Sequence, residues 1–192
     1  MTLRPEQIRA AEYLHHKGTL LPAGQIHERV AAAFVAMEGL LDDVSEGEAR
    51  ACAIPGEWTI QEVVDHLVET HRPSLHELRD LLADRRPAGG PIPASLQSVA
   101  PMSRRFTDLV KDLKDVHAEI LGVLSAAPDR MTDARAPIVM VINATEPDGR
   151  EAPLHWIEEL DWKAYAIIFR LHEIDHLNQA KKTLKAARAS AP

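Results

Sequence analysis

Apolar side chains recur every three or four positions along four long stretches of the chain, which is the period of an amphipathic α-helix. In the first stretch they are Ile26, Val30, Ala33, Phe34, Met37, Leu40, Leu41 and Val44. The pattern predicts long helices over residues 23–48, 59–86, 103–126 and 155–187, and a short N-terminal helix over 5–16. Four long amphipathic helices predict an all-α bundle whose apolar faces meet in one core.

The second long helix has start and stop signals of its own. Thr59 and Glu62 form a Thr-x-x-Glu capping box, in which each side chain accepts a free backbone N–H of the first turn. Pro73 removes one backbone hydrogen bond and predicts a kink. The Pro- and Gly-rich stretch 87–93 suits no regular element and predicts a loop.

The segment before the last helix has a different pattern. Pro137–Asn143 is short and rich in β-branched residues, which is typical of a strand. Glu146-Pro147-Asp148-Gly149 is a turn sequence, and Arg150–Leu154 can return as the partner strand. We therefore expect a small β-hairpin between the third and fourth long helices.

Composition and charge restrict the class of protein. The 192 residues are 45% apolar and 27% charged, which suits one soluble domain spanning residues 1–192. The net charge of −7 argues against a nucleic-acid partner, since such domains carry a basic patch or stripe. A single cysteine, Cys52, excludes an intramolecular disulfide, and no stretch resembles a signal peptide or a membrane span. These features predict a cytoplasmic protein without a membrane partner.

The candidate chemistry lies in the last helix, where His172 and His176 are four residues apart and share a face. His172 falls inside the apolar stripe and His176 at its edge, so both should point inward or line a cleft. A buried neutral imidazole needs a hydrogen-bond partner or a metal. Both interpretations stay open, and the spacing differs from the His-Glu-x-x-His motif of thermolysin-type zinc helices.

A third imidazole could come from the second long helix, which contains His66 and His71. Periodicity places His71 near the centre of the apolar face and His66 at its flank, so geometry favours His71 at least as much. His76 and His117 are expected to face solvent or lie at a boundary. His15, His16, His27 and His155 have no constellation around them and are expected at the surface.

Three neutral imidazoles suit zinc, nickel, copper or ferrous iron, and they leave a coordination position free for water or substrate. Carboxylates stand beside the histidines in the sequence. As acceptors they would orient the imidazoles, and as surface charges they need no role. They are Asp65, Glu69, Glu173 and Asp175.

Two stretches resemble a known family. Trp58-Thr59-Ile60-Gln61-Glu62-Val63-Val64-Asp65-His66-Leu67 resembles the second-helix motif of the DinB/YfiT-like superfamily, and His172-Glu173-Ile174-Asp175-His176-Leu177-Asn178-Gln179 resembles its final-helix motif. The resemblance implies a four-helix bundle, often a homodimer, with a divalent metal, zinc or nickel, held by His66, His172 and His176. It also implies that His71 lies near the site.

Three candidate functions stay open, and the resemblance implies the first two. The first is a low-molecular-weight-thiol S-transferase, in which a metal-activated thiolate attacks a small electrophile. The second is a metal-dependent hydrolase using metal-bound water, with Asp175 or Glu69 as the catalytic base. The third is a non-enzymatic bundle that binds metal or small molecules in a stress response. Asp175 stands where some YfiT-like members have another histidine, and the 137–153 insert has no match in the family pattern.

Overall fold

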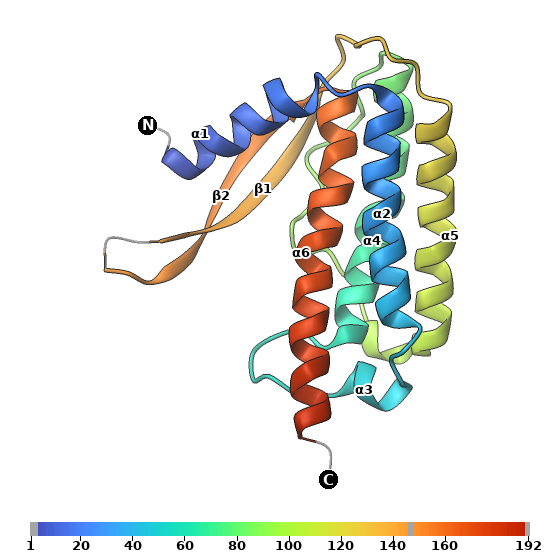
Figure 1. Cartoon of the computed structure of the whole chain (residues 1–192), viewed down its shortest axis with the longest axis vertical. Helices are drawn as coiled ribbons and strands as arrows, with labels where there is room; N and C mark the ends of the chain where they lie inside the picture. Colours follow the sequence, from blue (N-terminus) through green and yellow to red (C-terminus); the bar gives the residue numbers. More distant parts are fainter. Residues whose placement is uncertain (1–3, 146–147, 191–192) are drawn as a thin grey trace.

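The computed structural model describes residues 4–145 and 148–190, and this part of the chain is mostly helical with a small two-stranded antiparallel sheet (Figure 1). In chain order the elements are α1 (Pro5–Glu12), a π-helical segment (Tyr13–Gly18), α2 (Ala23–Leu41), α3 (Glu46–Arg50), α4 (Ile60–Leu82), a 3-10 turn (Pro101–Ser103), α5 (Phe106–Ser125), β1 (Ala136–Thr145), β2 (Glu151–Leu160) and α6 (Trp162–Ala189). The prediction of a mainly helical chain with a hairpin before the last helix is confirmed.

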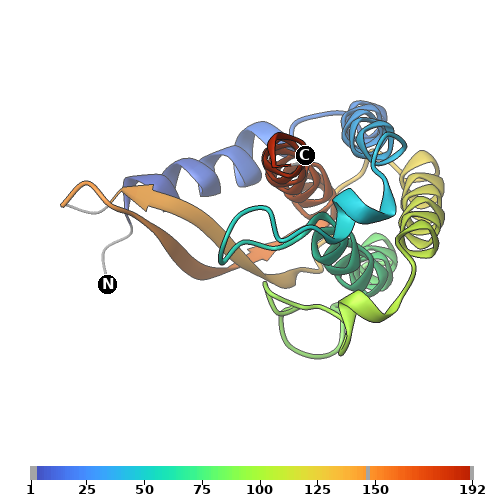
Figure 2. The same cartoon turned by 90° about the horizontal axis from the view of Figure 1, so that it is seen from below.

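The long helices α2, α4, α5 and α6 lie side by side (Figures 1 and 2). Contacts between side chains give the direction of α4 relative to α5. Arg72 contacts Asp112 at 2.6 Å and Arg79 contacts Glu119 at 3.1 Å, each pair 40 residues apart in the chain. Because the offset is constant, α4 and α5 run parallel, and residues 83–105 must return along the length of α4.

The direction of α2 relative to α5 follows from a second set of contacts. Glu38 contacts His117, and Asp42, four residues further along α2, contacts Lys114, three residues earlier in α5. Because the residue number in α5 falls as the residue number in α2 rises, these two helices are antiparallel. The starts of α4 and α5 adjoin, since the Gln61 amide donates to the Pro101 and Arg104 carbonyls at 2.9 and 3.0 Å.

The start of α4 follows the predicted capping box. The Glu62 N–H donates to Thr59 Oγ1 at 3.2 Å, and the Thr59 N–H donates to Glu62 Oε2 at 2.7 Å. The helix continues through Pro73 and ends at Leu82, before the predicted end near Arg86. This cap places the first turn of α4, and therefore His66, at a defined height along the neighbouring helices.

The first long helix is shorter than predicted. It ends at Leu41, and Glu46–Arg50 form the separate helix α3. Ser45 starts α3 with its own capping box: its N–H donates to Glu48 Oε2 at 2.8 Å, and its Oγ accepts from the Glu48 N–H at 3.3 Å. Val44 lies between α2 and α3 and continues the apolar spacing of α2, although it is not in a helix. The prediction of one helix over 23–48 was therefore wrong.

The last helix starts at Trp162, not near His155. Asp161 is its N-cap, with Oδ1 accepting from the Ala164 N–H at 3.0 Å. Residues 155–160 belong instead to β2, where Leu160 is 0% exposed and Ile157 is 60% exposed. The two apolar residues are three positions apart, which mimics a helical step, although the real period is two.

The hairpin pairs Ala136 with Leu160 and Met140 with Trp156. Ala136, Met140 and Leu160 are buried and lie on one face of the hairpin. The second strand extends to Leu160, beyond the predicted end at Leu154. Of the predicted turn, residues 146–147 lie outside the described residues. The hairpin extends away from one end of the long helices, and α1 lies beside it (Figure 2). His15 Nε2, in the π-helical segment that follows α1, lies 2.6 Å from Glu158 Oε1 of β2.

The core between the long helices is apolar, with one exception. Its largest fully buried side chains include Phe34, Leu67, Leu113 and Trp162. Among the described residues four histidines and one glutamate are buried, and such ionisable groups are rarely buried without a partner. These are His66, His71, His117, Glu173 and His176. Across the described residues, no helix is long and apolar enough to cross a membrane.

Candidate metal centre

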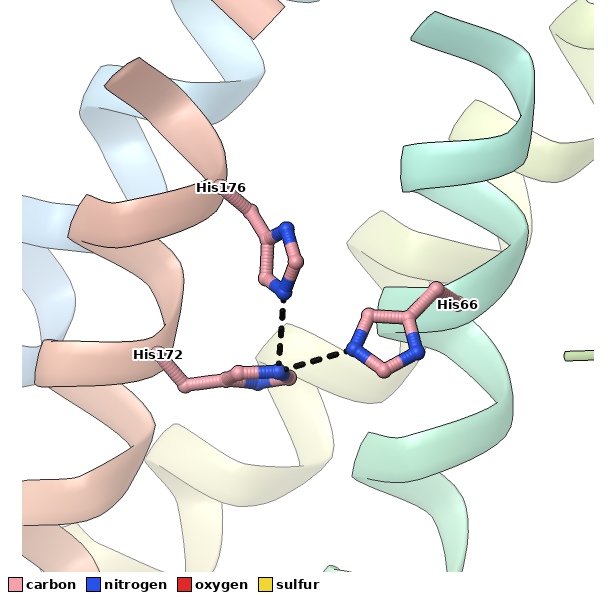
Figure 3. Close-up of side chains that lie close together, drawn as sticks. All are labelled: His66, His172 and His176. Atoms are coloured by element: carbon pink, nitrogen blue, oxygen red, sulfur yellow. Dashed lines mark hydrogen bonds between the residues drawn. The ribbon is translucent and has the colours of Figure 1, made fainter. Parts of the chain in front are cut away.

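Three histidines from two helices converge on one point (Figure 3). His66 Nε2 on α4 lies 3.0 Å from His172 Nε2 on α6, and His176 Nε2 lies 3.1 Å from the same atom. One turn of α6 stacks His172 and His176, and α4 supplies the third ring from across the helix interface. The structure therefore brings together the three residues that the resemblance selects.

The contacts of the Nδ1 atoms decide which nitrogen of each imidazole can bind a ligand. His66 Nδ1 lies 2.7 Å from the Leu96 carbonyl, and His176 Nδ1 lies 2.8 Å from Gln179 Oε1. Both partners are acceptors, so each Nδ1 carries the proton and donates. The Nε2 atoms of His66 and His176 are then unprotonated, and their lone pairs point at His172.

The Nε2 separations fit a shared ion. Two nitrogens at about 2.0–2.1 Å from one zinc ion are about 3.3 Å apart at a tetrahedral angle and about 2.9 Å apart at a right angle. The observed 3.0 and 3.1 Å fall between these values. Without an ion, one proton on His172 Nε2 would have to serve two acceptors. The donor set therefore fits a divalent metal.

Burial keeps these imidazoles in the form that binds metal. It lowers the pKa of His66 to about 4, with a smaller contribution from the neighbouring His176. Burial also lowers the pKa values of His172 and His176. All three rings are neutral at pH 7, and only a neutral imidazole offers a lone pair. The Trp58 ring covers the group, with its centroid 5.0 Å from that of His66.

The hydrogen bonds of the Asp65 side chain go to a loop and not to an imidazole. Its carboxylate accepts from the Ser98 N–H at 2.8 Å and from Ser98 Oγ at 2.7 Å, and its side chain is 1% exposed. Ser98 is two residues from Leu96, whose carbonyl holds His66. Asp65 thus fixes the loop that orients the imidazole next to it in sequence.

The two carboxylates predicted as candidate bases are not part of the three-histidine group. Glu69 is half-buried and pairs with Arg72 at 3.3 Å, and Asp175 is exposed. Neither belongs to a group of potential ligands in the part of the chain that the structure describes. Their role in catalysis stays a prediction.

A second group of buried ligands was missed in the sequence. It consists of His71, His117 and Glu173. The prediction that His117 faces solvent or a boundary is wrong, because it is 1% exposed. The signal was present: His117 stands four residues after Leu113 and three before Ile120, on the apolar stripe of α5. Glu173 is 0% exposed, so it is not a surface charge.

Of two pockets in the structure, one adjoins these groups of histidines and the other does not. A cavity of about 30 Å³ is lined by His71, Ile138, Tyr165, Phe169 and His172 among others, and it can hold a water molecule beside the histidines. A larger open groove of about 610 Å³ runs between the ends of α4 and α5, where Leu82 and Pro128 line it. No histidine lines that groove, so of these two pockets the small cavity is the one that adjoins the candidate centre.

Comparison with known proteins bears on the same region. None of the curated proteins matches the chain. The family model of the DinB superfamily matches residues 30–180, which is most of the chain and contains His66, His172 and His176. The matched segment also contains α4, α5, the hairpin and most of α6. The chain therefore belongs to the DinB superfamily.

Proposed function

We propose that the protein binds zinc or nickel through His66, His172 and His176 and transfers a low-molecular-weight thiol to a small electrophile. The observation that supports this is the convergence of three Nε2 atoms, with separations of 3.0 and 3.1 Å, from two helices. Three protein ligands leave a position for a further ligand, which is typical of a catalytic site. When bound, the metal would supply a Lewis acid that lowers the pKa of a coordinated thiol or water.

The residues of the chain prepare this centre in three ways. The Leu96 carbonyl and the Gln179 amide orient two rings, so that little reorganisation is needed on binding. Burial keeps the imidazoles neutral. Trp58 provides an aromatic wall next to His66 and His176, against which an apolar electrophile can pack.

Thiol transfer is favoured over hydrolysis by the surroundings of the three histidines. Activated water is commonly assisted by a carboxylate base, as in the His2Glu zinc proteases. Within the described residues, the ligand group around His172 includes no carboxylate, and both Glu69 and Asp175 lie outside it. A thiol has a pKa of about 8.5 and needs no separate base once this value is lowered.

The family resemblance supports further parts of the proposal. We propose that α2, α4, α5 and α6 form the four-helix bundle of the superfamily, since α4 and α5 are parallel and α2 is antiparallel to α5. By the same analogy the protein is a YfiT-like homodimer that works in the cytoplasm on small molecules.

Metal analysis combined with a thiol-transfer assay tests this function. The protein is loaded with zinc or nickel, and its metal content is measured beside a His172→Ala/His176→Ala variant. Bacillithiol, mycothiol and glutathione are then each mixed with an electrophilic aryl halide, and loss of free thiol is followed. We expect metal-dependent thiol consumption by the parent and none by the variant.

The alternatives give different results in the same experiment. Turnover of an ester, amide or phosphate panel without thiol consumption would replace transfer by hydrolysis. Bound metal with tight small-molecule binding and no turnover in either screen would indicate a non-enzymatic binding protein. No metal in the parent after loading would remove the metal-dependent functions altogether.

A further inference from the structure

A second set of metal-ligating side chains lies deeper between the helices than the three-histidine centre. His71 on α4, His117 on α5 and Glu173 on α6 have ligand atoms that all lie within 4.8 Å of one another. Their exposed fractions are 1%, 1% and 0%. Three different helices thus direct one side chain each to the same enclosed place.

Five polar atoms of these side chains lack hydrogen-bond partners. Both nitrogens of His71, Nε2 of His117 and both carboxylate oxygens of Glu173 are unpartnered among the described residues. A buried polar group without a partner costs about 1–3 kcal/mol, and an ionised one costs more. Four of them, Nε2 of His71, Nε2 of His117 and the two oxygens of Glu173, can face one ligand. Native interiors pair nearly all such groups, so these atoms indicate that a ligand belongs between them.

The distances favour a cation over a water molecule. Glu173 Oε2 lies 3.7 Å from His71 Nε2 and 3.6 Å from His117 Nε2, which is too long for hydrogen bonds between the side chains. If an ion lay about 2.1 Å from each atom, the two N–ion–O angles would be about 120°. If a water molecule lay at a hydrogen-bond distance of about 2.8 Å from each atom, these angles would be about 80°, well below the tetrahedral angle that water prefers.

His117 is oriented as a metal ligand commonly is. Its Nδ1–H donates to Glu38 Oε1 at 2.8 Å, and its ring stacks on Phe34 with centroids 3.7 Å apart. A carboxylate behind a ligating imidazole fixes the tautomer and leaves Nε2 free. Burial raises the pKa of Glu173, and a bound cation would offset this by stabilising the ionised carboxylate.

We propose that His71 Nε2, His117 Nε2 and the Glu173 carboxylate bind a second divalent transition-metal ion, separate from the three-histidine centre. Two imidazoles and one carboxylate suit zinc or ferrous iron. The site does not depend on the thiol-transfer activity. It adjoins the first centre, since the His71 and His172 rings are 5.6 Å apart and Glu173 follows His172 on α6.

A proton is the competing occupant. Burial lowers the pKa of His117, but attraction by Glu173 and Glu38 outweighs this and the net shift is upward. A protonated His117 between the two carboxylates would also balance the negative charge of Glu173. It would leave both ring nitrogens of His71 without a partner. Metal stoichiometry distinguishes the two occupants, because only the proposed ion adds an equivalent of metal.

The test measures metal content after refolding, since ligands that are 0–1% exposed do not exchange readily in the folded protein. The chain is unfolded with denaturant and chelator, refolded with excess zinc, desalted and analysed for zinc per chain. We expect two equivalents in the parent, one in Glu173→Gln, and one in His172→Ala/His176→Ala. His76→Ala, which removes an exposed histidine from the same helix α4, should keep two.

The outcomes separate this inference from the proposed function. One equivalent in both the parent and Glu173→Gln would overturn the second site and leave the three-histidine centre intact. As a check that does not rely on variants, crystals of the zinc-refolded parent are measured at the zinc absorption edge. An anomalous peak bonded to His71, His117 and Glu173 supports the proposal, and a water or no density there overturns it.

Discussion

His66 Nε2 on α4 lies 3.0 Å from His172 Nε2 on α6, although 106 residues separate them in the chain. The two helices are antiparallel neighbours: eleven residues further along α4, Glu77 accepts from the Tyr165 hydroxyl at 2.5 Å, seven residues earlier in α6. Because the helices meet in this register, one imidazole from α4 reaches two stacked imidazoles of α6.

Removing His66 should remove the stabilisation that metal gives through the three-histidine centre. A ligand that binds only the folded state at 100 times its Kd adds about 2.7 kcal/mol to the free energy of unfolding. We expect zinc to raise the Tm of His66→Ala clearly less than that of the parent, because only the second group of ligands is then complete, as measured by differential scanning calorimetry. His76→Ala serves as the control and should respond like the parent. An equal rise in His66→Ala would show that zinc binds elsewhere.

Asp65→Ala should weaken metal binding without touching a ligand. The change removes the acceptor of the Ser98 N–H and Oγ and loosens the loop whose Leu96 carbonyl orients His66. Loss of such outer contacts typically lowers metal affinity about 10–100-fold. Competition against a chromophoric chelator measures the affinity, with the exposed Asp108→Ala as control. An affinity equal to that of the parent would mean that the loop does not orient His66.

The metal-free protein should lose stability as the pH falls below about 6.5. Burial lowers the pKa of His66 from 6.5 to about 4, so the unfolded chain binds more protons between these values. The free energy of unfolding then decreases with falling pH, by up to about 3 kcal/mol from this residue at 1.36 kcal/mol per pKa unit. Urea unfolding at a series of pH values measures the decrease, which should be smaller in His66→Ala. A flat profile between pH 6.5 and 4 would contradict the burial of neutral histidines.

A matched pair of substitutions tests the assignment of residues 155–160 to a strand. Leu160 is 0% exposed and Ile157 is 60% exposed. Leu160→Ala should lower the free energy of unfolding by about 2–5 kcal/mol, as for other buried leucines. Ile157→Ala should change it by about 0.5 kcal/mol or less. Denaturant unfolding measures both, and equal losses would show that the two residues do not lie on opposite faces.

The sequence alone determined the elements and part of the candidate site. Helical periodicity, the Thr59–Glu62 capping box and the Pro- and Gly-rich loop depend on interactions within a few residues, so the helices and the hairpin could be predicted. The stacking of His172 and His176 is equally local, because it follows from one helical turn. Boundaries failed at Val44 and Ile157, where an apolar residue happened to extend the wrong period.

Tertiary structure decided the rest. Periodicity left His66 and His71 open as the third ligand, because the rotation of α4 relative to α6 depends on packing between helices. The same packing buried His117 and Glu173 together and placed Asp65 against a distant loop. Such contacts join residues tens of positions apart, so no local pattern contains them. They exist only once the antiparallel and parallel registers of the four helices are set.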